Sequence, residues 1–346
     1  MTDGAMTFPV DAPKSALVCA LDWGLGHVAR TTPLVRSLLA ADAKVTLASN
    51  GRSAAWWRSE FPQLETRELP DYGVSYRNGW KLVPGLLGSL PRIAKAIRQE
   101  SALVRNWQAA DGFDMILSDN RYGCRVQGTK SVLLTHQLRL AAPSGMGWCE
   151  PGGEFAMSRM VRNFDEVWVP DAADGNSLSG KLGHPAHPGS FPALRHIGPL
   201  SRFVDSPTAA WTEAWDTVAL VSGPEPARTT FQNRLEQILS CRPGRHLLVR
   251  GRPDLPAPLG NFAESGLVVV PHLATPDLAR ALVGAQEIIC RGGYSTVMDL
   301  AALGILDERC LFVPTPGQTE QEYLARNLAL THKTRTISVS ELGSKP

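Results

Sequence analysis

The chain has 346 residues, of which 43% are hydrophobic and 20% are charged, and its formal net charge is +2. This length exceeds what one hydrophobic core usually serves, so we expect two domains, and the composition excludes a largely disordered protein. The small net charge argues against a nucleic-acid-binding protein, because such proteins usually carry a large positive charge.

The sequence predicts a cytoplasmic protein without a structural metal. No run of about 18 apolar residues occurs, so we expect no transmembrane helix, and residues 1–14 lack the apolar core of a signal peptide. The six cysteines are scattered without a Cys-x-x-Cys pair, which indicates reduced thiols and no zinc framework. His184 and His187 lie in the proline-rich stretch HPAHP with no adjacent acid or cysteine, so we expect no metal site there.

The first half alternates short apolar runs with helical patterns. A helix is predicted over Pro33–Ala41, where Leu34, Leu38 and Leu39 share one face, and another over Arg52–Phe61. This alternation is typical of parallel βαβ units. The runs predicted as strands are Ala16–Leu21, Lys44–Ser49, Leu64–Leu69, Met115–Ser118, Ser131–Thr135 and Glu166–Val169.

Polar residues follow three of these predicted strands. Asp119 ends the fourth run, His136 follows the fifth, and Asp171 follows the sixth. The carboxyl ends of parallel strands lie on one rim of the sheet, which is where open α/β sheets bind ligands. We therefore expect Asp119 and His136 on one rim of the sheet, where a ligand can bind.

Residues 81–105 are predicted to form a basic amphipathic helix. A segment of this kind, flanked by tryptophans, can lie on an anionic membrane surface or bind a phosphorylated acceptor. The alternative is a crossover helix with a solvated basic face, because most surface helices have one apolar and one polar side. Against the single acid Glu100, the basic residues are Lys81, Arg92, Lys95, Arg98 and Arg105.

A stretch rich in Pro, Ser and Thr ends at Trp211 and is typical of a linker, so we expect domains at residues 15–200 and 215–346. The α/β pattern restarts in the second half, with helices predicted over Ala227–Leu239, Pro276–Val283 and Glu320–Ala329. The strand-like runs are Val218–Val221, His246–Val249, Leu267–Val270, Glu287–Cys290, Cys310–Val313 and Thr334–Val339.

The first predicted strand ends in a glycine loop that carries a histidine. Gly24 and Gly26 partly match a dinucleotide-binding pattern, but the third glycine is missing and no acid ends the second strand, which argues against an oxidoreductase. The imidazole of His27 can take a proton from an attacking hydroxyl. Asp22 is expected either to orient His27 or to act as the base itself; alternatively, His27 only caps the following helix.

Two loops of the second half also join a strand to the start of a helix. Free backbone N–H groups at helix starts bind anions, so these loops predict a nucleotide-diphosphate site that stabilises a pyrophosphate leaving group. No Asp-x-Asp motif occurs, so Mg²⁺ is not implied. The residues expected at this site are Ser222, Gly223, Glu225, Arg228, Arg291, Gly292, Gly293, Ser295 and Thr296, with the acid pair Asp299 and Glu320.

Two stretches of the second half, CRGGYSTVMDLAALG and LFVPTPGQTEQEYLARNL, resemble the C-terminal signature of glycosyltransferase family 28. The best-known member of this family is the N-acetylglucosaminyltransferase that makes lipid II of peptidoglycan. The loop GLGHVAR is similar to the Gly-x-Gly-His loop that opens the N-terminal domain of these enzymes. It is also similar to the same loop in the nucleotide-sugar hydrolase of pseudaminic acid synthesis.

The resemblance implies the α/β architecture called GT-B, in which two Rossmann-like domains with parallel sheets face an interdomain cleft. The donor nucleotide sugar then binds the C-terminal domain and the acceptor binds the N-terminal domain, which places Asp119 and His136 on the acceptor side. The resemblance also implies that Asp299 holds the ribose hydroxyls, that Ser295 and Thr296 contact the diphosphate, and that His27 lies beside it.

The donor sugar is expected to contact Glu320 and Gln321, again by resemblance to the family. The chain departs from the family pattern at two places. Gly293 stands where a serine is usual, which removes one hydroxyl donor from the turn. Glu320-Gln321-Glu322 stands where a pair of glutamines is common, which bears on the identity of the sugar.

Together these features predict an inverting, metal-independent glycosyltransferase with no bound cofactor. Its donor is expected to be a nucleotide-diphosphate sugar, first of all a UDP-sugar, and its acceptor an unidentified hydroxyl compound, with membrane contact only through residues 81–105 at the inner face. The alternatives are a nucleotide-sugar hydrolase of the same fold, a non-hydrolysing epimerase and a catalytically silent nucleotide-sugar-binding protein.

Overall fold

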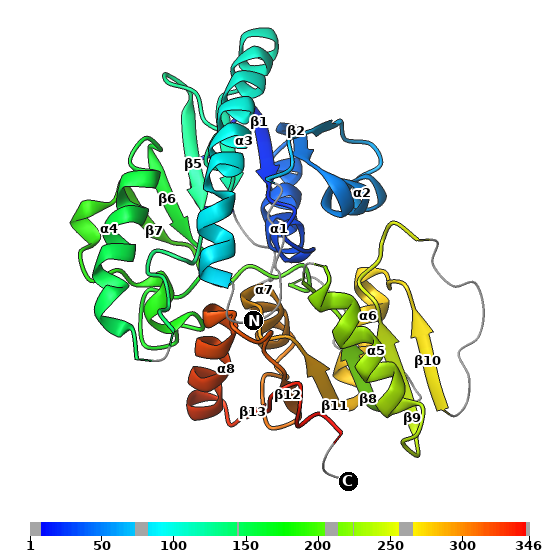
Figure 1. Cartoon of the computed structure of the whole chain (residues 1–346). Coiled ribbons are helices and arrows are strands. Elements are labelled where there is room, and N and C mark those ends of the chain that lie inside the picture. Colours follow the sequence, from blue (N-terminus) through cyan, green and yellow to red (C-terminus); the bar gives the residue numbers. More distant parts are fainter. Residues whose placement is uncertain are drawn as a thin grey trace. The chain divides into compact units, whose positions relative to one another are not determined.

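The computed structural model describes residues 8–72, 82–143, 145–204, 214–223, 225–255 and 266–343, with the backbone alone for 82–90. The chain forms two compact units. The first consists mainly of residues up to Leu200 and the second mainly of residues from Ser201, and Trp23–Gly26 group with the second unit. Each unit is an α/β layer structure built on one parallel sheet (Figure 1).

The sheet of the first unit has seven strands in the order β3-β2-β1-β4-β5-β6-β7, all paired in parallel. The order reverses between β1 and β4: the chain adds β2 and β3 on one side of β1, and then adds β4 and the later strands on the other side. The strands are β1 (Ser15–Ala20), β2 (Lys44–Ser49), β3 (Thr66–Glu68), β4 (Met115–Asp119), β5 (Lys130–Leu134), β6 (Glu166–Val169) and β7 (Ala193–His196). The helices are α1 (Gly26–Ala40), α2 (Gly51–Glu60), α3 (Leu82–Asp111) and α4 (Glu150–Val161), with short 3₁₀ turns at Gly147–Cys149, Gly180–Gly183 and Pro188–Ser190.

The second unit repeats this plan with six parallel strands in the order β10-β9-β8-β11-β12-β13. Here the order reverses between β8 and β11. The strands are β8 (Trp215–Leu220), β9 (Arg245–Val249), β10 (Gly266–Val270), β11 (Ala285–Cys290), β12 (Cys310–Phe312) and β13 (Arg335–Thr336). The helices are α5 (Ala227–Leu239), α6 (Thr275–Val283), α7 (Tyr294–Ala302) and α8 (Thr319–Thr331).

Buried apolar runs explain why the central strands form. Residues 16–20 of β1 are fully buried, as expected for a strand covered on both faces by helices. In the first unit, Val104 of α3 packs with Leu17 of β1 and Ile116 of β4. In the second, Phe231 of α5 packs with Ala219 of β8 and other apolar residues of the sheet. These clusters anchor the helices that begin at the strand ends.

Two helices differ from the sequence prediction. Helix α1 begins at Gly26, seven residues before the predicted start, and runs through Pro33. The hydroxyls of Thr31 and Thr32 donate to carbonyls of the preceding turn, so these residues are accommodated inside the helix. Helix α4 was not predicted, because its two glycines mask a helical pattern in which Met157 and Val161 are buried.

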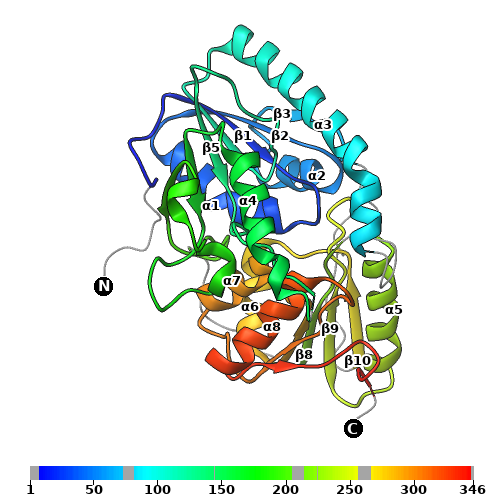
Figure 2. The ribbon, with the colours of Figure 1, turned by 60° about the vertical axis from the view of Figure 1, so that its left-hand side comes forward.

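Helix α3 has a solvated basic face in the part whose side chains are described. Arg92, Lys95, Arg98 and Arg105 are exposed, whereas Ala96, Glu100 and Val104 are buried. Residues 91–105 are part of the helix that connects β3 to β4 and have an exposed basic face, which agrees with both interpretations of this segment, and Figure 2 shows the helix along the first unit. Lys81 lies outside the described residues. Contact between this segment and a membrane stays a prediction.

Among the residues whose side chains are described, the large exposed apolar side chains of the first unit lie around α4. Trp148 is 79% exposed and Phe155 68% exposed, and they are accompanied by Leu140, Met146 and Met160. In the part of the chain that the structure describes, no helix combines the length and the apolar character needed to cross a membrane.

A buried ion pair ties α3 to the rim of the first sheet. The Arg121 guanidinium lies two residues after β4 and donates from Nη1 to the Glu100 carboxylate at 2.8 Å and to the Pro70 carbonyl at 2.6 Å. It also donates to the Ala20 carbonyl at 3.2 Å and to the Asn50 side-chain oxygen. One side chain therefore holds the residues that follow or end β1, β2 and β3.

We expect Arg121→Met to lower the free energy of unfolding by about 3–5 kcal/mol, because it leaves the buried Glu100 carboxylate without its counter-charge and removes one donor from each of two carbonyls. The measurement is urea unfolding followed by circular dichroism. Arg58→Met is the control, because Arg58 and its partner Glu68 are at least half exposed, and we expect it to cost less than about 0.5 kcal/mol. Equal losses in the two variants would contradict the bracing role.

Candidate functional site

His27 and Asp119 meet at the point where the strand order of the first sheet reverses. His27 lies in the first turn of α1, directly after the loop that follows β1, and Asp119 ends the neighbouring strand β4. The His27 Nδ1 atom is 2.8 Å from the Asp119 Oδ1 atom. The Asp119 side chain is fully buried, whereas the His27 side chain is 15% exposed.

Arg30 joins this pair to His136. Its guanidinium is buried, donates from Nε to Asp119 Oδ2 at 2.6 Å, and contacts Asp119 Oδ1 as well. Its Nη1 atom lies 2.9 Å from Nδ1 of His136, which follows β5. The structure therefore brings together His27, Asp119 and His136, three of the residues singled out from the sequence. Arg30 was missed, although its position one helical turn after His27 is the signal that could have found it.

The Asp119 carboxylate is held in its ionised form. Burial alone would raise the pKa of Asp119, but the charges of Arg30 and His27 outweigh burial and hold that pKa below its ordinary value. An ionised carboxylate only accepts hydrogen bonds, which favours the tautomer in which His27 donates its Nδ1–H to Asp119 and keeps its lone pair on Nε2. Nη2 of Arg30 lies 3.0 Å from the same Nδ1 atom. A histidine fixed in this tautomer can take a proton from a hydroxyl through Nε2.

Asp22 has a different partner from the one predicted. Its Oδ1 atom accepts hydrogen bonds from the Ser53 backbone N–H at 3.2 Å and from the Ser53 hydroxyl at 2.7 Å. Asp22 thus satisfies free donors in the first turn of α2. The interpretation that Asp22 orients His27 is wrong, because Asp119 does so. Asp22 as the base stays a prediction.

The two predicted loops of the second unit lie side by side. They follow β8 and β11, which are paired neighbours at the reversal of the strand order, and they lead into α5 and α7 (Figure 1). Arg291 connects them directly, because its Nη2 donates to the Ala227 carbonyl in the first turn of α5 at 3.3 Å. Both helix N-termini are therefore held at the same edge of one sheet, where their free N–H groups favour an anion.

Unused hydroxyl groups lie in these loops. The side chains of Ser222, Ser295 and Thr296 are partly exposed, and their hydroxyls make no hydrogen bond within the described residues. Gly223 has φ of 101°, which favours glycine at this bend, and Gly293 precedes α7 without a side-chain cap. The loops thus present hydroxyl donors that no group of the described residues occupies.

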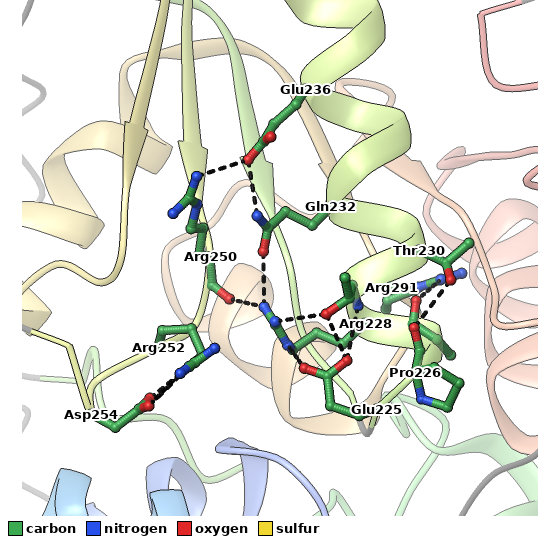
Figure 3. Close-up of polar contacts among 12 residues, drawn as sticks. Glu225, Pro226, Arg228, Thr230, Gln232, Glu236, Arg250, Arg252, Asp254 and Arg291 are labelled. Atoms are coloured by element: carbon green, nitrogen blue, oxygen red, sulfur yellow. Dashed lines mark hydrogen bonds and ion pairs between the residues drawn. The ribbon is translucent and has the colours of Figure 1, made fainter.

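Glu225 and Arg228 bind each other rather than standing free for a ligand. The Arg228 Nε donates to Glu225 Oε1 at 2.7 Å, and its Nη1 donates to the Arg250 carbonyl at 3.0 Å (Figure 3). The second oxygen of Glu225 accepts from the Thr229 N–H and hydroxyl, which caps α5. Both residues therefore fix the first loop, and their direct contact with a donor stays a prediction.

Asp299 also has partners inside the second unit. Its Oδ1 accepts from the Ser201 hydroxyl at 2.7 Å, and its Oδ2 lies 3.4 Å from Nε of Arg202. Burial raises the pKa of Asp299, and Arg202 and Ser201 oppose this effect. A carboxylate oxygen can accept more than one hydrogen bond, so these partners leave acceptor capacity on Asp299, and the ribose assignment stays a prediction.

Helix α8 contributes to the same edge of the sheet. The Gln321 side chain is buried, and its Oε1 accepts from the Thr315 N–H at 2.8 Å. The backbone carbonyl of Gln321 would lie 3.3 Å from a Cβ at Gly292, so the start of α8 packs against the turn before α7. Glu320 is partly exposed in the first turn of α8. Contact between these residues and a donor sugar stays a prediction.

The remaining predicted residues take simple positions. Gly24 has φ of 105° in the loop after β1, and Gly26 begins α1. In the stretch HPAHP, the ring nitrogens of His184 face the carbonyls of Gly180 and Ala172 at 2.9 and 3.1 Å. Among the described residues, no three His, Cys, Asp or Glu side chains converge as a metal site would require.

The two glycines before α7 should respond differently to substitution. Gly292→Val should lower the free energy of unfolding by about 1–3 kcal/mol, because its side chain overlaps the start of α8. For Gly293→Ser, the added Cβ would meet no atom within 4 Å, and we expect a change of about 0.5 kcal/mol or less. Urea unfolding tests both, and a stable Gly292→Val variant would contradict the packing described here.

Comparison with known proteins places the chain near one group of sequences. No protein-family model matches the chain. A UDP-N-acetylglucosamine–N-acetylmuramyl-(pentapeptide) pyrophosphoryl-undecaprenol N-acetylglucosamine transferase of Albidiferax ferrireducens is 28% identical over 272 residues, 75% of this chain and 63% of the relative. The transferase of the same name from Methylorubrum populi is 25% identical over 344 residues, 95% of this chain and 85% of the relative. The match thus spans less than two thirds of the first relative's length.

Solved structures agree in fold. The spinosyn rhamnosyltransferase SpnG, solved with thymidine diphosphate, has a TM-score of 0.59 at 16% identity, covering 95% of this chain and 90% of that one. The kitacinnamycin glycotransferase has a TM-score of 0.58 at 18% identity, with coverages of 97% and 92%. MurG of Acinetobacter baumannii has a TM-score of 0.51 at 15% identity, with coverages of 95% and 88%. The chain therefore has the GT-B fold that its sequence led us to expect, and its sequence is similar to that of the MurG-type transferases.

Proposed function

We propose that the chain is a glycosyltransferase that uses a nucleotide-diphosphate sugar, a UDP-sugar first of all, and that it inverts the anomeric centre without a metal. The observation that carries this proposal is the pairing of β8 with β11, which sets the starts of α5 and α7 side by side. Two helix N-termini and the free hydroxyls of Ser222, Ser295 and Thr296 suit the growing negative charge of a departing diphosphate.

The base in this proposal is His27. An acceptor hydroxyl gives its proton to Nε2 and attacks the anomeric carbon in one displacement, which inverts that carbon. The imidazolium that forms is stabilised by the Asp119 carboxylate, which the buried Arg30 keeps ionised. In this proposal His27 accepts the proton, Asp119 stabilises the imidazolium charge, and the loops after β8 and β11 stabilise the departing diphosphate.

The comparisons support the donor class by analogy. The sequence relatives act on UDP-N-acetylglucosamine according to their names, and the structure of SpnG holds thymidine diphosphate. Nucleoside diphosphates are therefore common to the relatives, while the base and the sugar differ. The direct test is calorimetric titration of the protein with UDP, dTDP and GDP. If the protein binds none of the three, the proposal is overturned.

His27→Ala should lower kcat by about 10²–10⁴, because the acceptor proton then has no positioned base. Its affinity for the nucleoside diphosphate should stay within about twofold, because its imidazole is assigned to proton transfer and not to donor binding. Asp119→Asn should also lower kcat, since an amide cannot stabilise the imidazolium. Steady-state turnover and calorimetry measure the two effects, with Asp22→Asn as the comparison. A larger loss of kcat in Asp22→Asn than in His27→Ala would transfer the role of base to Asp22.

The nearest alternative is a hydrolase of the same fold, in which water replaces the acceptor. With a UDP-sugar and no acceptor, we expect a transferase to release free sugar at less than about a hundredth of its transfer rate, because water lacks the binding energy that positions an acceptor. Coupled detection of UDP and of free sugar separates the cases. Stoichiometric sugar release at full rate would favour the hydrolase, and tight binding without any turnover would favour a silent binding protein.

A further inference from the structure

Arg291 differs from the other buried arginines of the described chain. Four arginines are buried in that part of the chain, and three of them pair with a carboxylate: Arg30 with Asp119, Arg121 with Glu100, and Arg228 with Glu225. Arg291 is 2% exposed and forms no ion pair within the described residues. Its positive charge is therefore buried without a counter-charge, an arrangement that costs free energy.

The contacts of Arg291 are to backbone carbonyls and to an aromatic ring. Nη1 donates to the Val313 carbonyl at 2.9 Å, and Nη2 donates to the Ala227 carbonyl at 3.3 Å. The guanidinium carbon lies 3.9 Å from the centre of the Phe231 ring, and the buried Nε has no hydrogen-bond partner. Burial lowers the pKa of Arg291 to about 10, so the guanidinium still carries its charge at neutral pH.

The position of this charge is also unfavourable in the free protein. Ala227 lies in the first turn of α5, and Arg291 precedes the start of α7 by three residues. The N-terminus of a helix carries partial positive charge, so a cation there is of the wrong sign. A desolvated cation between two helix N-termini is relieved by an anion and by no neutral ligand. The described residues supply no such anion.

We propose that Arg291 is a positioning residue whose charge is balanced by the diphosphate of the bound nucleotide, while its two carbonyl bonds hold the loops after β8 and β11 at a fixed separation. The inference rests on the proposed function and adds one point to it: the positive charge of Arg291 makes the site bind a diphosphate more tightly than less charged ligands. The guanidinium does not need to touch the ligand, because it acts through the field that it adds to the two helix starts.

The test compares ligands of increasing charge on variants of one residue. Arg291→Gln removes the charge and keeps a side-chain donor for one carbonyl, whereas Arg291→Lys keeps the charge and can bond only one carbonyl. We expect Arg291→Gln to weaken UDP binding by roughly ten- to thirtyfold, UMP by less, and uridine by no more than about twofold. Arg291→Lys should stay within about threefold of the wild type for UDP.

Arg309→Gln is the matched control, because Arg309 lies just before β12, at the opposite end of that strand from the loops, and pairs with Asp307. It should leave the affinity for all three ligands unchanged. Calorimetry measures the affinities, and circular dichroism checks the fold of each variant. If Arg291→Gln does not fold, Arg291→Lys still tests the inference. Because lysine keeps the positive charge, a loss of UDP affinity above tenfold in this variant would show that the charge is not what supports binding.

Two other outcomes overturn the inference. Equal weakening of UDP, UMP and uridine in Arg291→Gln would indicate that the residue only supports the loops. A glutamine variant that binds UDP like the wild type would remove Arg291 from recognition altogether. Failure of the proposed function itself is distinct, because the wild-type protein would then bind none of the nucleoside diphosphates.

Discussion

The reversal of strand order in a parallel sheet is the constraint on which both candidate sites depend. Where the crossovers leave two neighbouring strands in opposite directions, the loops that follow them separate and leave room at the carboxyl edge. In the first unit this happens between β1 and β4, which places His27 against Asp119. In the second it happens between β8 and β11, which places two helix starts together. Backbone topology thus decides which residues can act together.

Buried charge serves a different purpose in each unit. In the first unit Arg30 and Arg121 each meet a carboxylate, and both pairs are hydrogen-bonded to strand ends. Such pairs contribute little net stability, but removing one partner is costly, so they fix geometry. In the second unit Arg228 is paired in the same way and Arg291 is not. The unit that is proposed to bind the anionic donor is therefore the one that retains an unbalanced cation.

The sequence predicted the strands of both sheets except β7, because most of them are continuous buried apolar runs, a pattern that survives without knowledge of the fold. Strand β7 was missed, because its residues are only partly buried or exposed and form no apolar run. The sequence prediction also failed at α4, where two glycines hide the helical period, and at the start of α1, where two threonines and a proline look unlike a helix. Fold class and the pairing of the two glycine loops could be predicted, because βαβ topology determines both.

The partners of polar residues could not be read from the sequence. Arg30 and Asp119 are 89 residues apart, and Arg121 and Glu100 are 21 apart, so local spacing carries no sign of either pair. For the same reason Asp22 was placed beside His27, its near neighbour in sequence, although it caps α2 through Ser53, 31 residues away. Residues that were chosen as ligands, such as Glu225 and Asp299, proved to hold other protein groups.

The hydrogen bonds from Arg121 to the ends of three strands have a consequence for how the loops of such a protein can vary in evolution. Arg121 holds the start of each loop by hydrogen bonds to the Ala20 and Pro70 carbonyls and to the Asn50 side chain. The parts of the loops beyond these residues can therefore vary in length and composition without displacing Asp119, which lies two residues before Arg121. New hydroxyl compounds could then be accommodated by loop variation alone, while the His27–Asp119 pair that we propose as the proton acceptor keeps its geometry.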